Sequence, residues 1–440
     1  MDCARCAVSG FVIWTYFVIR HSDFIIIIMT LYFVAGEASG DNHGAELMRS
    51  LRQCDADLNF LGRGGPQMKA IAGEQFANWI DDVAIVGLWE VIKNYGFFRE
   101  KFRETLAEIE KSKPDAVVLI DYPGFNLRLA RALRRTTGSE PVRPAGAAPD
   151  DSASNMPAGR TDEKTSVFRR KIIKIIYYIS PQVWAWHRGR IKKMARFLDL
   201  MLCIFPFEAE LYNKSGLRTV FVGHPMIDRL RARKIDSKRD PNLVGLFPGS
   251  RSREVARNFP VLLDVARELF RAKHVLRFEI AAASESLAAE ISDVLTAARM
   301  REGLFRVVTG ETAATMQRAF VGIVASGSAT LEAAYFQLPF VLIYKVAWPT
   351  YLAARLVVNV KYLGMPNVLA NKEVVPEFIQ HRARPKAIAR AVLRLMYNRA
   401  ARNRMISEFD AIVPKLGEGG ASAKAARTIV EELGTIMESR

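Results

Sequence analysis

The chain has 440 residues, 50% of them hydrophobic, and a formal net charge of +17 at pH 7. This length provides large cores for two or three domains, and the basic excess favours an acidic partner such as nucleic acid, anionic lipid or a phosphorylated substrate. Among the four cysteines, Cys3 and Cys6 form a single C-x-x-C, which argues against a disulfide framework and a structural zinc site. We therefore expect a reducing, cytoplasmic setting and no bound metal.

The N-terminal segment is apolar but interrupted. Residues 7–34 are rich in apolar residues, and Arg20-His21-Ser22-Asp23 divides them into parts shorter than the ~18–20 residues of a membrane-spanning helix. No convincing signal-peptide cleavage site precedes Met29. We expect translation to begin at Met29, so that "MTLYFVAGE" forms the first strand and residues 1–28 are an extension to which we assign no role.

Short apolar, β-branched runs alternate with helical patterns along most of the chain. The expected strands are residues 31–35, 59–61, 116–121, 172–179, 200–205, 219–222, 243–247, 277–281, 305–308, 322–325 and 340–343. Helices fall between them, for example at residues 253–271 and 329–336. This alternation indicates parallel sheets covered by helices on both faces, and the number of strands favours two doubly wound α/β domains.

Three further segments define the domain organisation. The sequence turns polar and charged at residues 225–240, where we place the boundary between the domains. Residues 137–166 are rich in Pro, Gly, Ala, Ser and Asp and are predicted to be a flexible insertion without a core. Apolar residues at helical spacing predict C-terminal helices at 399–412 and 422–434. The predicted units are residues 29–225, 226–398 and 399–440.

Two turns in the first domain carry more polar groups than plain connectors need. "AGEASGD" ends the first strand and presents Glu37, Ser39 and Asp41 around Gly40; we favour an N-cap role for Asp41 on the next helix. In "LIDYPGFN", Asp121 ends a wholly apolar strand at the edge where ligands bind, which suits a general base that takes a proton from a hydroxyl. The alternative for Asp121 is a helix cap, and we favour the base.

Two turns in the second domain suit an anion. In "VGLFPGSRSREV" a strand ends at residues 249–251 just before a helix, where backbone N–H groups and the helix dipole favour negative charge. The alternative is a plain turn with a solvated Arg251. "VASGSATLEA" repeats this pattern at residues 326–328, with Glu332 one turn further on to accept from sugar hydroxyls. Both turns suit a nucleotide diphosphate, and the lack of a P-loop or G-x-G-x-x-G weakens ATPase and dehydrogenase interpretations.

The segment "YYISPQVWAWHRGRIKKMAR" joins aromatic residues to a basic run at residues 188–196. Trp184 and Trp186 lie at a strand-to-helix junction, which favours buried packing or a carbohydrate-binding face over nucleic acid. The basic run is either a solvated helix face or a contact for anionic lipid or a phosphorylated acceptor. His224, in "FVGHPMID", is either a catalytic or phosphate-contacting group or a structural histidine.

Residues 83–103, "VAIVGLWEVIKNYGFFREKFR", carry more apolar and aromatic surface than one helix face can bury. Aromatic and basic residues together suit a membrane interface, and the alternative is a core helix with a basic outer face. The predicted membrane contacts are Val86, Leu88, Trp89, Ile92, Phe97 and Phe98.

A series of short motifs stands in a fixed order along the chain: "VAGEASGD", "GRGGPQM", "VGLWEV", "IDYPGFN", "YYISPQVWAW", "FPFE", "FVGHPMID", "FPGSRSRE", "SGSATLE", "MPNVLA" and "PEFIQ". The same order is found in lipid-A-disaccharide synthases, and the chain resembles this family from about Met29 to about Leu433. The resemblance implies a GT-B glycosyltransferase fold, with two Rossmann-like doubly wound domains, an inter-domain cleft and C-terminal helices that pack back on the N-terminal domain.

The resemblance also implies a reaction. The family transfers 2,3-diacylglucosamine from UDP-2,3-diacylglucosamine to 2,3-diacylglucosamine 1-phosphate, with inversion, giving lipid A disaccharide 1-phosphate and UDP. We expect no cofactor and no nucleic acid, and a peripheral location at the inner face of the cytoplasmic membrane, docked through the 83–103 segment. Some members form dimers, so a homodimer is a further expectation.

Residue roles follow from the same resemblance. Asp121 is expected to be the base for the acceptor 6-hydroxyl, and Arg251 to stabilise the leaving diphosphate. Glu332 is expected at the ribose hydroxyls and Asn367, in "MPNVLA", in the nucleotide cleft. The UDP contacts are Gly249, Ser250, Arg251, Ser326, Gly327, Ser328, Ala329, Thr330, Glu332 and Asn367. The acceptor side comprises Glu37, Ser39, Gly40, Asp41 and His224.

Other classes of protein stay open at this point. A UDP-N-acetylglucosamine epimerase or the transferase that makes lipid II would share the fold, and an epimerase would act without an acylated acceptor. A non-catalytic membrane-surface or nucleic-acid binding protein would explain the charge but would not need Asp121. Asp55 and Asp57 form a D-x-D, which binds metal in the other main glycosyltransferase fold; here it precedes a strand at a turn, and we interpret it as incidental.

Overall fold

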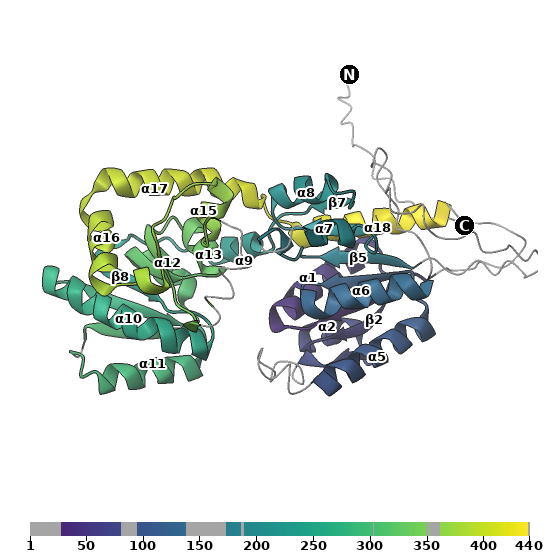
Figure 1. Cartoon of the computed structure of the whole chain (residues 1–440), viewed down its shortest axis with the longest axis horizontal. Coiled ribbons are helices and arrows are strands. Elements are labelled where there is room, and N and C mark those ends of the chain that lie inside the picture. The colour runs from purple at the N-terminus through teal and green to yellow at the C-terminus, as the bar shows by residue number, and fades with distance from the viewer. Residues whose placement is uncertain are drawn as a thin grey trace, which may run out of the picture.

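Two parallel β-sheets, each covered by helices, form the two halves of the molecule (Figure 1). The computed structural model describes residues 28–80, 95–137, 173–185, 189–301, 303–348, 351 and 361–438. Neighbouring strands run parallel throughout both sheets. The expected doubly wound α/β architecture is therefore confirmed.

The first sheet has the strand order β3-β2-β1-β4-β5-β6-β7. Its strands are β1 (Thr30–Ala35), β2 (Asn59–Gly64), β3 (Phe76–Asn78), β4 (Ala116–Ile120), β5 (Lys174–Tyr178), β6 (Leu200–Cys203) and β7 (Thr219–Phe221). The accompanying helices are α1 (Ala38–Cys54), α2 (Pro66–Ala72), α5 (Tyr95–Ser112), α6 (Pro123–Thr137), α7 (Gly189–Met194) and α8 (Pro206–Asn213), with a 3-10 turn, η2 (Val183–Ala185).

Alternate residues of the first sheet enter two separate cores. On β4, which is buried at every position, Val118 and Ile120 pack in the cluster that contains α1 side chains. Val117 and Leu119 pack in the cluster that contains α5 and α6 side chains. Successive side chains of a strand point to opposite faces, so a strand that is apolar throughout needs a helical layer on each side.

The second sheet has the strand order β10-β9-β8-β11-β12-β13. Its strands are β8 (Asp240–Phe247), β9 (Arg277–Ala282), β10 (Phe305–Thr309), β11 (Ala319–Ala325), β12 (Phe340–Tyr344) and β13 (Glu377–Ile379). The helices of this half are α9 (Met226–Ala232), α10 (Ser252–Ala272), α11 (Glu285–Ala297), α12 (Thr312–Arg318), α13 (Ala329–Tyr335), α15 (Met365–Ala370), α16 (Pro385–Tyr397) and α17 (Arg399–Ile412), with 3-10 turns η3 (Gln380–Arg382) and η4 (Val413–Leu416).

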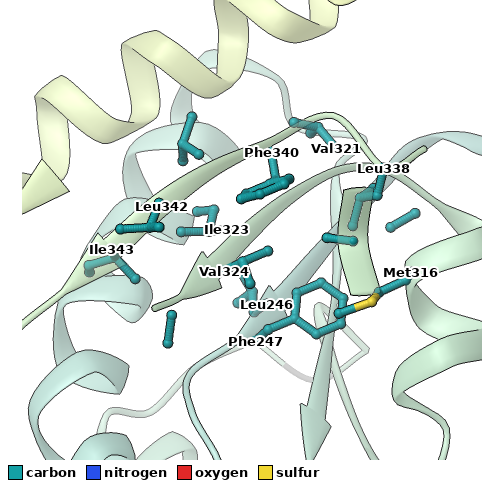
Figure 2. Close-up of a cluster of buried hydrophobic side chains, with 14 of the residues drawn as sticks. Leu246, Phe247, Met316, Val321, Ile323, Val324, Leu338, Phe340, Leu342 and Ile343 are labelled. Carbon is teal, nitrogen blue, oxygen red and sulfur yellow. The ribbon is translucent and has the colours of Figure 1, made fainter. Parts of the chain in front are cut away.

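The hydrophobic core of the second half is continuous across neighbouring strands. Figure 2 shows part of it, with Leu246 of β8, Val324 of β11 and Leu342 of β12 in one buried cluster. Met226 and Leu230 of α9 belong to the same cluster. Helix α9, inside the segment where we predicted the domain boundary, therefore packs with the second sheet.

The C-terminal helix α18 (Ala421–Glu438) returns to the first half, whereas α16 and α17 lie on the second (Figure 1). Ala425 and Ile429 of α18 pack in the core cluster that contains α1 side chains. The buried Glu432 carboxylate lies 2.8 Å from Lys174 Nζ on β5 and 2.7 Å from Arg218 Nη1. These contacts attach the end of the chain to a strand 258 residues earlier.

A strand is present at each position where the sequence predicts one, with some shifts at the ends. The sequence did not reveal β3 and β13, which have three residues each and lie at sheet edges, because such short strands carry no measurable period. The predicted helix at residues 399–412 coincides with α17. The N-terminal extension up to residue 27 and residues 138–166 of the insertion lie outside the described residues.

We predict that Glu432→Ala lowers the free energy of unfolding by about 3–5 kcal/mol, because it leaves the buried Lys174 ammonium without its carboxylate. Urea denaturation followed by circular dichroism measures this loss. The matched control is Glu431→Ala, at the neighbouring exposed position, which should change stability by no more than about 0.5 kcal/mol. Equal effects of the two substitutions would contradict a structural role for this ion pair.

Candidate active site

The polar turns predicted from the sequence lie where the strand order of each sheet reverses. In the first sheet the reversal falls between β1 and β4, which end at Ala35 and Ile120. In the second sheet it falls between β8 and β11, which end at Phe247 and Ala325. Open α/β sheets bind ligands in the crevice outside the carboxyl ends of the strands at such a switch point.

The turn after β4 holds Asp121 in a strained backbone conformation. Asp121 and Tyr122 have φ values of +45° and +50°, which lie in the left-handed region. The Asp121 carbonyl accepts hydrogen bonds from Tyr177 Oη at 2.5 Å and from Asn126 Nδ2 at 2.8 Å. The Asp121 N–H donates to the Tyr178 carbonyl at 3.0 Å. These three hydrogen bonds hold the backbone of Asp121 in its left-handed conformation. Surrounding contacts of this kind are what allow a strained backbone to persist at a functional position.

The turn after β1 packs directly against the Asp121 turn. A Cβ atom at Gly36 would lie 2.3 Å from the Tyr122 ring, so only glycine allows this approach. The close approach brings the exposed Glu37 side chain near Asp121. Ser39 is exposed at the start of α1, and Gly40 is buried behind it.

Burial and a like charge act together on Asp121. Burial raises the pKa of the Asp121 carboxyl from its ordinary value to about 6, the Glu37 carboxylate adds to the rise, and the Tyr122 N–H opposes it. A carboxylate whose pKa lies close to the working pH is a more effective general base than an ordinary one. Asp121 lies one residue before the N-cap position of α6, and its carboxyl bonds to the Tyr122 N–H, which precedes the helix; this favours the base over the cap interpretation.

Asp41 caps a different helix from the one we predicted. It lies inside α1, whose N-cap position is Glu37. The buried Asp41 carboxylate accepts from the N–H groups of Gly65 at 3.0 Å, Gln67 at 2.9 Å and Met68 at 2.9 Å. Gly65 is the N-cap of α2 and has no side chain, so Asp41 supplies the missing acceptor. We therefore correct the capping assignment from α1 to α2.

In the second half, the predicted anion site holds a carboxylate of the chain itself. Arg251 is the N-cap of α10, and its side chain is 76% exposed. The Ser250 N–H donates to Glu254 Oε2 at 3.1 Å, and Arg251 Nη1 lies 3.4 Å from Glu254 Oε1. Glu254 was missed by the sequence reasoning, although it stands in the quoted motif. Its position indicates that the Gly249–Arg251 turn attracts negative charge.

The turn after β11 is open at its glycine. Gly327 has φ +142°, and a Cβ atom added there would meet no other atom within 4 Å. Ser326 donates its N–H to the Ile343 carbonyl at 3.1 Å, and Thr330 Oγ1 donates to the Gly327 carbonyl at 2.8 Å. Ser328 is the N-cap of α13, which begins at Ala329. Hydrogen bonds within the second half therefore fix the conformation of the turn, and there is free space beside Gly327.

Glu332, one turn into α13, forms an ion pair that links two helices. Its Oε1 lies 3.2 Å from Arg229 Nη2 on α9, and its side chain is only 12% exposed. A ribose at Glu332 would meet a carboxylate that Arg229 already orients. Local sequence patterns could not reveal this pair, because 103 residues separate its members.

Asn367 lies in the interior of the second half rather than on a ligand surface. It is completely buried. Its Oδ1 accepts from the N–H groups of Val374 and Val375, and its Nδ2 donates to the Val375 carbonyl and to Glu377 Oε1, all at 2.7–2.8 Å. These four bonds use the hydrogen-bonding capacity of the amide completely. We therefore correct its predicted role from a nucleotide contact to a group that fixes the loop between α15 and β13.

His224 joins three elements at the junction of the two halves. Its backbone N–H donates to the Leu416 carbonyl in η4 at 2.7 Å, and its imidazole Nδ1 accepts from the Met226 backbone N–H of α9 at 3.2 Å. Burial, with smaller contributions from nearby His43 and Arg229, lowers the pKa of His224 to about 3. The imidazole is therefore neutral near pH 7, and its contacts match the structural alternative.

Two aromatic predictions have different outcomes. Trp184 is buried and donates its indole N–H to Glu208 at 2.9 Å, as expected for packing rather than for a carbohydrate face. Of the predicted membrane contacts, Phe97 and Phe98 on α5 are half-buried against the core cluster that contains α5 and α6 side chains. Val86, Leu88, Trp89 and Ile92 lie outside the described residues.

In the described part of the chain, no helix is both long enough and apolar enough to cross a membrane. The same part contains no group of three or more His, Cys, Asp or Glu side chains placed to hold a metal ion.

The two doubly wound sheets, each with a polar turn at its switch point, define the GT-B fold. Solved structures share this architecture. They include a UDP-N-acetylglucosamine 2-epimerase from Rickettsia bellii (TM-score 0.55, 14% identity, 93% of this chain and 98% of that chain) and the calicheamicin glycosyltransferase CalG4 (TM-score 0.54, 13% identity, 93% and 100%). At these identities the likeness concerns the fold alone.

The sequence comparisons identify the family. The family model for lipid-A-disaccharide synthetase matches residues 31–142 and 165–426. The lipid-A-disaccharide synthase of Geobacter sulfurreducens is 35% identical, covering 92% of this chain and 97% of that protein, and lipid-A-disaccharide synthase 1 of Legionella pneumophila (strain Lens) is 33% identical, covering 91% and 96%. The chain belongs to the lipid-A-disaccharide synthase family and is a glycosyltransferase of lipid A biosynthesis. The epimerases share its fold at low identity, so the epimerase alternative is not favoured.

We predict that Glu254→Gln makes UDP bind about 3–10-fold more tightly, because it removes the carboxylate that occupies the Ser250 N–H and the Arg251 guanidinium. Isothermal titration calorimetry with UDP measures the change. The matched control is Glu268→Gln on the same helix, where Glu268 pairs with Arg271 at 2.7 Å. Weaker UDP binding by the Glu254 variant alone would mean that Glu254 orients Arg251 in the complex instead of competing for its site.

Proposed function

We propose that the chain transfers 2,3-diacylglucosamine from UDP-2,3-diacylglucosamine to 2,3-diacylglucosamine 1-phosphate, releasing UDP and lipid A disaccharide 1-phosphate. Family membership supports the substrates. The observation that carries the proposed mechanism is Asp121: a partly buried carboxylate at the switch point, in a turn determined by three hydrogen bonds, with a pKa raised to about 6.

The proposed chemistry is a single displacement. The acceptor 6-hydroxyl oxygen attacks C1 of the donor sugar while Asp121 takes the hydroxyl proton, and the bond from C1 to the diphosphate oxygen breaks. The new C1–O6 bond forms on the face opposite the leaving group, so the configuration inverts to β. The electron pair of the broken bond leaves on UDP. Stabilising the negative charge that develops there usually contributes more to the rate than removing the proton does.

The donor diphosphate is assigned to the turn at Gly249–Arg251 and to Ser326–Thr330, with the ribose near Glu332. Two features support this assignment. Arg251 extends into solvent at the N-terminus of α10, and Gly327 has open space above it. The Glu254 carboxylate leaves the Ser250 N–H when the diphosphate arrives, because both anions use the same donor.

Membrane docking and dimer formation belong to the same proposal. Both substrates are acylated, so the enzyme works at a lipid surface, the inner face of the cytoplasmic membrane, with which it associates peripherally. The 83–103 segment, which ends in the half-buried Phe97 and Phe98 and their basic neighbours, is the proposed contact. A homodimer is proposed from the family resemblance alone.

We predict that Asp121→Asn lowers the transfer rate by about 10²–10⁴-fold, the usual contribution of a general base. Asparagine tolerates the left-handed backbone, so the turn should keep its shape, whereas alanine would add strain. Release of UDP and formation of disaccharide, followed by mass spectrometry in detergent with both substrates, measure the loss.

The control for this substitution is Asp57→Asn, which should leave the rate unchanged if the D-x-D match is incidental. The Asp121 variant should also be at least as stable as the parent at pH 8, because a raised pKa in the folded state means that ionised Asp121 opposes folding there. Full activity of the Asp121→Asn variant would support the proposed reaction but would rule out Asp121 as its general base.

The pH dependence supplies an independent test. Because the base must be ionised, kcat/KM of the parent should rise with pH through about 6 and then level off. Glu37→Gln removes the neighbouring negative charge, so the midpoint should move to lower pH. Glu46→Gln, on α1 but not among the groups that perturb Asp121, should leave it in place. If the pH midpoint of kcat/KM were the same in the Glu37→Gln variant as in the parent, the titrating group would not be Asp121.

A further inference from the structure

A cavity of about 600 Å³ lies between α6 and α7 on the outer face of the first sheet. It is lined by Pro123, Gly124, Leu127, Arg128, Arg131, Arg134, Arg135, Arg190, Lys193, Met194, Arg196 and Phe197. Leu127, Met194 and Phe197 are its apolar members, and seven of the others are cationic. We call this cavity, with these residues, the basic groove. Its apolar patches among cationic side chains suit an amphiphilic anion.

The basic groove follows from helical spacing on two short segments. On α6, residues 124, 127, 128, 131 and 135 recur at intervals of three and four, so they share one face of the helix. On α7 and the turn after it, Arg190, Lys193 and Phe197 recur in the same way. The two faces meet across the cavity, although residues 138–188 separate the helices in the sequence.

The charge of the basic groove is not neutralised by carboxylates that line it. Within the described ranges no Asp or Glu lines the cavity, and α6 itself contains no acidic residue. Arg134 alone is buried, where it pairs with Asp199 and donates to the Phe197 carbonyl at 3.4 Å, which holds the two walls together. Arg128, Arg131, Arg190 and Lys193 are exposed.

Helix α10 differs from α6, because it neutralises two of its cations locally. On α10, Arg267 pairs with Asp264 at 2.8 Å and Arg271 with Glu268 at 2.7 Å. Like charges three or four residues apart cost a helix about 0.2–0.5 kcal/mol per pair, so the stripe on α6 is unfavourable for folding alone. An unneutralised stripe that forms one wall of a cavity is more consistent with binding an anion than with a solvated surface.

The basic groove begins beside the proposed base. Pro123 and Gly124, which are among its lining residues, follow Asp121 by two and three residues. Arg128 lies in the second turn of α6 and Arg190 in the first turn of α7, both on the side nearer the carboxyl edge of the sheet. A rise of about 1.5 Å per residue puts Arg128 within about 10 Å of the Asp121 turn, the reach of one sugar ring and its substituents.

We propose that the basic groove binds the phosphate monoester of the lipid acceptor, with Arg128 and Arg190 as its principal contacts. The proposal rests on the function proposed above and names the subsite that the acceptor 1-phosphate occupies while its 6-hydroxyl faces Asp121. Guanidinium groups match phosphate oxygens in geometry and charge. The headgroup of an anionic phospholipid has related chemistry, but it would not need a groove that starts at the base.

The test compares two ligands that differ only in the phosphate. Binding of 2,3-diacylglucosamine 1-phosphate and of 2,3-diacylglucosamine, each in neutral detergent micelles, is measured by thermophoresis with the full chain. The parent should prefer the phosphorylated lipid by about tenfold or more, and the double variant Arg128→Gln/Arg190→Gln should lose this preference. The variant should also raise KM for the acceptor without changing KM for the UDP-sugar.

The matched control is Lys192→Gln, an exposed cation on α7 that does not line the basic groove, and it should behave as the parent. Unchanged preference in the double variant, or no preference in the parent, would overturn the proposal. So would a variant that binds the acceptor normally in neutral detergent but no longer sediments with phosphatidylglycerol vesicles, which would assign the groove to phospholipid. A parent that binds the phosphorylated lipid selectively but forms no disaccharide would support the groove while the proposed function fails.

Discussion

The site depends on one constraint of the parallel sheet: all strands end at the same edge. Where the strand order reverses, the loops after two neighbouring strands run in opposite directions and leave a crevice. β1 and β4 create one such crevice, and β8 and β11 create the other. The proposed base and the proposed diphosphate turn therefore do not need special scaffolding of their own, because the topology already brings each to the end of a buried strand.

Within that frame, the turn after β4 determines how Asp121 behaves. Its left-handed backbone is kept in place by Tyr177 and Asn126, and Gly36 allows the turn after β1 to press against Tyr122. The same packing removes water from the Asp121 carboxyl and brings Glu37 close, so one set of contacts both orients the base and raises its pKa. Loosening the turn would therefore weaken orientation and basicity together.

The sequence predicted the sheets well, because buried parallel strands are continuous apolar runs. It also predicted that Asp121 directly follows such a strand, whereas its role as the base stays a prediction. It predicted poorly whatever depends on a distant partner. Asp41 looked like a cap of its own helix, and only the fold brings Gly65 to it. Asn367 was expected in the nucleotide cleft from the resemblance of its motif, but its four hydrogen bonds join it to residues that fold over it. Local patterns cannot reveal such pairings.

The two anion-attracting regions differ in how they hold charge before a ligand arrives. At the β8 turn, Glu254 already satisfies the Ser250 N–H and faces Arg251, so an incoming diphosphate exchanges one anion for another. In the basic groove no carboxylate lines the cavity within the described ranges, although the buried Arg134 pairs with Asp199, and the exposed cations repel one another until a ligand binds. An anion that enters the groove relieves this repulsion as well as forming its own contacts. The groove should therefore respond more steeply to salt than the diphosphate turn, because screening weakens both its repulsion and its attraction for the ligand.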